Sequence, residues 1–206
     1  MEINPANYIL LNNLKEDPLF ISKYPVESLF GLKRDEALFK FNQKGSSIAT
    51  LVNILNFRLL LKSKSNMLDG NYKPISGYAE KESILQKLIS LGDWRGYILN
   101  DEYLIQNDLL RIMHYEGFVN GEAGKFKVED IDIDRVVMEE GYTSFDYLNI
   151  KGLPTSLIGS QLAYRPPKSR RIAMLSIGNT EIVLSCDKEV DYSNSKAGYY
   201  EVRSSF

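Results

Sequence analysis

Cysteine and histidine are almost missing from this sequence, which holds one of each, Cys186 and His114. A single thiol cannot close a disulfide within the chain, and this is typical of proteins from a reducing compartment. One cysteine and one histidine are also too few for the four-ligand sites in which these side chains bind zinc. Serine or cysteine catalysis assisted by histidine would have to use His114. We expect Cys186 to be inert and His114 to have a structural role.

Common nucleotide-binding and hydrolase motifs are absent as well. The sequence has no G-x-x-x-x-G-K-[ST], G-x-G-x-x-G or G-x-S-x-G pattern, and no C-x-x-C or H-E-x-x-H pair. Its net charge of −2 gives no general attraction to nucleic acid or to an anionic membrane. The opening residues, Met-Glu-Ile-Asn-Pro, lack the basic and then apolar order of a secretion signal. We therefore expect a cytoplasmic protein without a cofactor or a metal ion.

No apolar run is long enough to cross a membrane, since a span needs about 20 uninterrupted apolar residues. The most apolar stretch, residues 46–62, is shorter and is interrupted by two asparagines and an arginine. Its apolar side chains recur with the helical period and occupy almost the whole circumference. A helix that is apolar nearly all round is buried on most sides. The stretch therefore predicts a buried helix over residues 48–61, capped by Ser46 or Ser47.

Helical periodicity is also found elsewhere in the first half of the chain. Asn4-Pro5 is a typical helix entry, with a capping residue followed by proline at the first helical position. Apolar side chains three and four residues apart then predict further helices. The expected helices run from Pro5 to Asp17, from 26 to 41, from 79 to 91 and from 101 to 115, the last one ended by Gly117.

Beyond Gly117 the pattern changes to alternation of polar and apolar residues, which indicates half-buried strands. The expected strands cover 125–129, 130–134, 171–177, 180–185 and 198–203. Gly178-Asn179 between two of them is the turn of a predicted β-hairpin. Residues 142–165 give no clear pattern, and their prolines favour loops around a short helix or strand.

Helices thus precede strands along the sequence, an order typical of α+β folds with segregated elements. We predict an N-terminal helical half, about residues 1–116, packed on a C-terminal mainly antiparallel β-sheet, about residues 117–206. No linker of low complexity separates the two halves, so a single compact domain over residues 1–206 is expected.

Acidic side chains gather at the start of the predicted β half. Asp130, Asp132 and Asp134 would share one face of a strand, because side chains alternate between its two faces. Successive carboxylates on that face are about 6.5 Å apart along the strand, too far to share one Mg²⁺ ion easily. We interpret the face as an interaction surface or a solvated face in preference to a metal site. The candidate partner-binding residues are Glu129, Asp130, Asp132, Asp134, Glu139, Glu140, Tyr142, Tyr199 and Tyr200.

The tyrosines in this set are included because the chain has thirteen of them, more than a core requires. Tyrosine is enriched in protein interfaces, although such rings could equally cover the rim of the sheet. A basic cluster also stands out, formed by Arg165, Lys168, Arg170 and Arg171. It is short and has no interleaved aromatic residues, which disfavours nucleic-acid binding and leaves pairing with the acidic strand as an alternative.

Three classes of function stay open at this point. The first is a non-catalytic protein-binding module, in its concrete form an immunity- or antitoxin-type inhibitor that neutralises a basic toxin or nuclease. The second is a metal-dependent phosphodiester or phosphate hydrolase that uses the acidic strand. The third is a DNA-binding regulator, since the elements expected over Leu104–Val128 loosely resemble a winged-helix order. The shortage of reactive side chains favours the first class.

Overall fold

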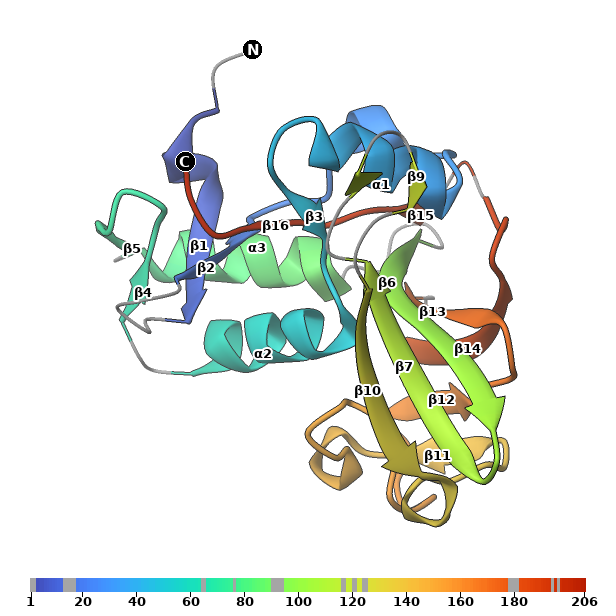
Figure 1. Cartoon of the computed structure of the whole chain (residues 1–206). Coiled ribbons are helices and arrows are strands. Elements are labelled where there is room, and N and C mark those ends of the chain that lie inside the picture. The colour runs from blue at the N-terminus through green and yellow to red at the C-terminus, as the bar shows by residue number, and fades with distance from the viewer. Residues whose placement is uncertain are drawn as a thin grey trace.

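The computed structural model of the chain describes residues 3–12, 18–63, 66–75, 77–89, 95–115, 118–119, 122–123, 126–177, 182–193, 195 and 197–206. Within these residues the chain forms three α-helices, a main β-sheet, a small β-sheet and two short ribbons (Figure 1). The helices are α1 (Arg34–Asn42), α2 (Leu51–Lys62) and α3 (Tyr78–Ile89). Short 3₁₀ helices cover Pro5–Asn7, Glu27–Leu29, Ile133–Arg135 and Phe145–Tyr147.

The main sheet has eight described strands, seven of them in the order β10-β7-β6-β13-β14-β12-β11. Their bounds are β6 (Arg95–Gln106), β7 (Leu109–Tyr115), β10 (Phe126–Asp132), β11 (Gly141–Thr143), β12 (Leu162–Arg165), β13 (Arg171–Ile177) and β14 (Ile182–Glu189). Neighbours pair antiparallel except β12 and β14, which are parallel, and β15 (Ala197–Gly198) adds to β6 in parallel. Residues 133–140 connect the edge strands β10 and β11, and Val136 in this connection is buried in the core.

The small sheet has the order β1-β2-β16-β3. Its strands are β1 (Tyr8–Asn12), β2 (Leu19–Ser22), β16 (Glu201–Arg203) and β3 (Ser47–Ile48). The ribbons pair β4 (Met67–Leu68) with β5 (Pro74–Ile75), and β8 (Phe118–Val119) with β9 (Glu122–Ala123). In the small sheet, β16 thus lies between two strands that are far from it in sequence.

The two faces of the main sheet cover different cores. Tyr97 and Leu99 on β6 pack with buried side chains of α2 and α3. Ile98 lies between them in sequence, points to the opposite face, and packs with Leu38 and Phe41 of α1. Helices α2 and α3 therefore cover one face of the sheet and α1 covers the other.

The buried helix predicted over residues 48–61 is confirmed as α2, and the helix predicted over 79–91 is confirmed as α3. The buried side chains of α2 are Leu51, Ile54, Phe57 and Leu61. Its cap is Thr50, whose hydroxyl accepts a hydrogen bond from the Asn53 backbone N–H at 3.3 Å. The predicted cap at Ser46 or Ser47 is wrong, because the chain is still extended there and Ser47 belongs to β3.

The helix predicted over residues 101–115 is wrong, because this stretch forms the hairpin of β6 and β7. Asn107 and Asp108 make its two-residue turn with φ of +51° and +60°. A type I′ hairpin turn needs this left-handed conformation at both positions, and Asn and Asp adopt it more readily than most residues. Gln106 and Leu109 pair directly across the turn. The apolar residues of this stretch fit the helical period and the strand period alike. The Asn107-Asp108 dipeptide is therefore the feature of the sequence that distinguishes a hairpin from a helix here.

The predicted N-terminal helical half packed on a C-terminal sheet is also wrong. The residues of the first predicted helix form a 3₁₀ turn at Pro5–Asn7 and then strand β1. The main sheet begins at Arg95, inside the half predicted to be helical. The helix predicted over residues 26–41 is split into a 3₁₀ turn and α1. The small sheet draws its strands from both ends of the sequence, and such long-range pairing leaves no periodic signal in either segment.

The hairpin predicted from residue 171 to residue 185 is confirmed in its strands, since β13 and β14 pair antiparallel. The alternating runs at 125–129 and 130–134 form one strand, β10, which ends at Asp132. The strand predicted over 198–203 is confirmed in part, as β16. Several predicted boundary residues lie outside the described part of the chain, namely Asp17, Leu91, Gly117, Lys125, Gly178-Asn179 and Thr180.

Arg34 is a fully buried charge at the start of α1, and it contacts the main sheet as well as the exposed Asp35 beside it. Its Nη2 donates a hydrogen bond to Glu102 Oε2 at 2.6 Å, and Tyr115 Oη donates to the same oxygen at 2.8 Å. The guanidinium lies over the Tyr115 ring, 4.6 Å from its centroid. Burial, and then the bond to Glu102, raise the pKa of Tyr115 to about 12 against the opposing effect of Arg34. This cluster fixes α1 to β6 and β7.

Replacing Glu102 with alanine removes the buried carboxylate that pairs with Arg34 and leaves only the longer contact with the exposed Asp35. We expect the free energy of unfolding to fall by about 3 kcal/mol or more. The half-exposed pair between Arg111 and Asp130 is the control, since Asp130→Ala should cost less than about 1 kcal/mol. Urea unfolding followed by circular dichroism measures both losses. Equal losses would show that the Arg34 cluster does not anchor α1.

Candidate functional site

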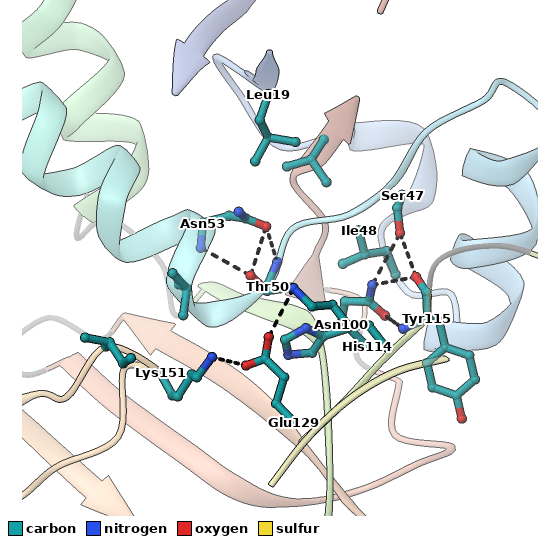
Figure 2. Close-up of a pocket in the computed structure, with 14 residues that line it drawn as sticks. Leu19, Ser47, Ile48, Thr50, Asn53, Asn100, His114, Tyr115, Glu129 and Lys151 are labelled. Carbon is teal, nitrogen blue, oxygen red and sulfur yellow. Dashed lines mark hydrogen bonds and ion pairs between the residues drawn. The ribbon is translucent and has the colours of Figure 1, made fainter. Parts of the chain in front are cut away.

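A cavity of about 410 Å³ lies where the start of α2 meets strands β6, β7 and β10. Residues 150–151 form a further wall, and the small sheet contributes apolar side chains. The volume falls within the range of small-molecule sites, about 300–1,000 Å³. Figure 2 shows that polar side chains from several elements line this cavity, among them His114, Glu129 and Lys151. We call it the polar pocket.

Strand register places three ionisable residues in one row beside this pocket. His114 on β7 is directly opposite Asp101 on β6 and directly opposite Lys127 on β10. Residues opposite each other in antiparallel strands project their side chains to the same face, so the three groups are neighbours. His114 Nε2 lies 3.2 Å from Asp101 Oδ1. A carboxylate in this position orients the imidazole, as it does in the acid–base sites of enzymes.

Asp101 also connects the sheet to the start of α2. Its side chain is 2% exposed, and its Oδ2 accepts a hydrogen bond from the Leu51 backbone N–H at 2.6 Å. The first N–H groups of a helix have no partner within the helix, and the positive end of the helix dipole favours a negative charge there. The buried carboxylate therefore has two sources of compensation, the helix terminus and His114.

Glu129 is the centre of a second charged group in the polar pocket. Its carboxylate lies 3.1 Å from Lys127 Nζ and is also paired with Lys151, which comes from the wall opposite β10. Partial burial raises the pKa of Glu129, but hydrogen bonds from the two lysines outweigh burial and hold the pKa below its usual value. Of the residues predicted to bind a partner, Glu129 is thus the one that faces this pocket.

The other predicted strand acids, Asp130 and Asp132, are exposed and already paired. Asp130 alternates with Glu129 and so lies on the face of β10 that points away from the polar pocket. It lies 3.1 Å from Arg111, and Asp132 lies 3.2 Å from Arg135. Charges on an edge strand such as β10 also hinder edge-to-edge aggregation.

The predicted face of three aspartates does not form, because Asp134 lies in the 3₁₀ turn that follows β10. Asp134, Glu139 and Glu140 are all exposed, and within the described residues they form no ion pair. These three carboxylates are the part of the predicted acidic surface that is open to a partner.

The three predicted tyrosines separate into two groups. Tyr142 on β11 is 52% exposed and follows the acidic residues directly in sequence. Tyr199 and Tyr200 are buried, at 0% and 1% exposed, and the hydroxyl of Tyr199 donates to the Leu32 carbonyl at 2.6 Å. The prediction that these two belong to a partner-binding surface is therefore corrected, because core packing uses their area.

Cys186 is fully buried, and burial raises the pKa of its thiol, which agrees with the inert role expected from the sequence. The basic cluster does not meet the acidic strand, since Arg171 pairs with Glu189 at 2.9 Å instead. Among the described residues, no group of three or more His, Cys, Asp or Glu side chains is placed to hold a metal ion. None of the described helices is long and apolar enough to span a membrane.

The sequence did not indicate that His114 lines the polar pocket or that Asp101 lies beside it. The helix predicted over residues 101–115 places Asp101 at a helix start and His114 near a helix end, whereas both residues lie in strands. The Asn107-Asp108 turn is the sequence signal for a hairpin, and this hairpin places Asp101 opposite His114. Nothing in the sequence around Lys151 predicts that this residue pairs with Glu129.

Comparisons of the chain with protein families, with curated proteins and with solved structures each find no significant match.

The lowered pKa of Glu129 makes a prediction about acid stability. A group whose pKa is lower in the folded state stabilises the fold above its unfolded-state pKa, about 4.3, and loses this effect as the pH falls through the folded-state value. The melting temperature of the wild type should therefore exceed that of Glu129→Gln most clearly above about pH 5, and the difference should shrink towards pH 2. Thermal melts across this range measure it, and a difference that grows on acidification would contradict the prediction.

Proposed function

We propose that this protein is a non-catalytic binding module that holds a basic partner protein through residues 130–142, which we call the acidic segment. The observation that carries the proposal is the exposure of Asp134, Glu139 and Glu140 without ion-pair partners among the described residues. Unpaired carboxylates attract a positively charged protein over several ångströms and raise the rate of correct encounter. The exposed ring of Tyr142 adds apolar contact area at the end of the segment.

The backbone of the acidic segment is fixed by contacts with the core and with neighbouring segments. Val136 is buried in the core, and the Val137 N–H donates to the Pro154 carbonyl at 3.0 Å. The hydroxyl of Tyr164 donates to the Val137 carbonyl, also at 3.0 Å. A segment that is already ordered loses little conformational entropy when a partner binds. This arrangement favours a preformed recognition surface over a loop that folds on binding.

The concrete form of the proposal is an inhibitor of the immunity or antitoxin type that neutralises a basic toxin or nuclease. An acidic surface competes with the nucleic acid that such an enzyme binds. The hydrolase alternative loses support because Asp130 and Asp132 are paired with arginines and Asp134 lies in the 3₁₀ turn after the strand. The winged-helix alternative loses support because residues 104–115 form strands.

The test is capture of partners from an extract of the source cells. A variant that carries Asp134→Asn, Glu139→Gln and Glu140→Gln should fold normally, because all three side chains are exposed. The wild type should retain a protein of high isoelectric point that the variant loses, and the isolated complex should weaken at least tenfold as salt rises from about 50 to 500 mM. Mass spectrometry identifies the partner and calorimetry measures the affinity.

The matched control removes the same number of charges elsewhere, through Glu27→Gln, Glu189→Gln and Asp191→Asn, at positions that are also exposed. The control should behave as the wild type does. Identical sets of proteins on the wild type and on the acidic-segment variant would contradict the proposal. Equal weakening in the control would mean that net charge, and not the acidic segment, decides binding.

A further inference from the structure

The polar pocket holds more hydrogen-bond donors than acceptors. Lys127 and Lys151 bring two ammonium groups to the single carboxylate of Glu129. Each ammonium carries three N–H donors. One carboxylate between two ammonium groups leaves an excess of positive charge and several donors for a further acceptor.

The acceptor atoms of Asp101 and Asn53 are already used and do not take up these donors. Asp101 is already engaged by His114 and by the Leu51 N–H. Asn53 Oδ1 accepts hydrogen bonds from the backbone N–H and from the hydroxyl of Thr50, both at 2.9 Å. The NH₂ end of the Asn53 amide is thereby left as a donor at the pocket wall. The first turn of α2 adds the positive end of a helix dipole.

Apolar side chains complete the lining of the same cavity. Leu19, Ile48 and Val202 come from the small sheet, and Ile150 comes from the wall that carries Lys151. A free inorganic ion would leave these side chains without a contact. A ligand with both a charged group and a hydrocarbon part satisfies both kinds of lining.

We propose that the polar pocket binds a small organic anion, whose carboxylate or phosphate group accepts hydrogen bonds from the N–H donors of Lys127 and Lys151 that Glu129 leaves open. Its hydrocarbon part lies against Leu19, Ile48 and Val202. The ligand is a small molecule in solution, and its site is separate from the acidic segment. The inference therefore does not depend on the proposed binding of a partner protein.

Titration of the ¹⁵N-labelled protein at constant ionic strength tests this site. The probes are hexanoate and hexyl phosphate, with acetate and inorganic phosphate as their counterparts without a hydrocarbon chain. At least one long-chain probe should give saturable shifts at the amides of Val52 and Lys127, and should bind at least threefold more tightly than its short counterpart. The probe that binds more tightly identifies the preferred anion. Absence of saturable shifts at these amides with every probe would overturn the proposal.

The variant Lys127→Gln combined with Lys151→Gln should weaken binding at least tenfold. Lys127→Gln alone, at a side chain that is more than half exposed, should fold as the wild type does and weaken binding about threefold or more. Lys40→Gln, an exposed lysine on α1 across the sheet, is the matched control and should stay within twofold. If Lys40→Gln weakens binding as much as Lys127→Gln, the attraction is general and the site is disproved.

Discussion

The buried carboxylate of Asp101 is the contact on which the arrangement around the polar pocket depends. One of its oxygens accepts the first N–H of α2, and the other faces the imidazole of His114 on the neighbouring strand. A carboxylate buried this deeply is stable only with such partners, because desolvation alone would cost several kcal/mol. The same side chain thus fixes the start of α2 against β6 and β7, and the walls of the pocket follow from that position.

Strand β10 carries charged side chains on both of its faces. The side chains of Lys127 and Glu129 point to the pocket, whereas Asp130 points to the opposite face and leads into the acidic segment. Alternation along this strand therefore separates the charges of the pocket from Asp130. The anion site and the protein-binding surface that we propose thus use different side chains of the same region.

Sequence alone predicted the elements whose pattern is local. The apolar circumference of α2, the amphipathic α3 and the alternating strands β13 and β14 all carry their periods within one segment. The pocket residues His114 and Lys127, and Asp101 beside them, could not be brought together in this way, because they become neighbours only through strand register. Lys151 and the buried Tyr199 depend on packing between distant segments, for which a single sequence gives no signal.

Strand β16 fills the gap between β2 and β3 in the small sheet, although its residues follow theirs by most of the length of the chain. Strand β3, and the edge of β2 that faces β16, can therefore form their strand hydrogen bonds only after residues 201–203 have been synthesised. Until then, the strands near residues 20 and 48 have unpaired edges. Such edges can pair with other chains and aggregate, and chaperones protect them. Pairing between strands so distant in sequence raises the contact order of this sheet, which slows folding.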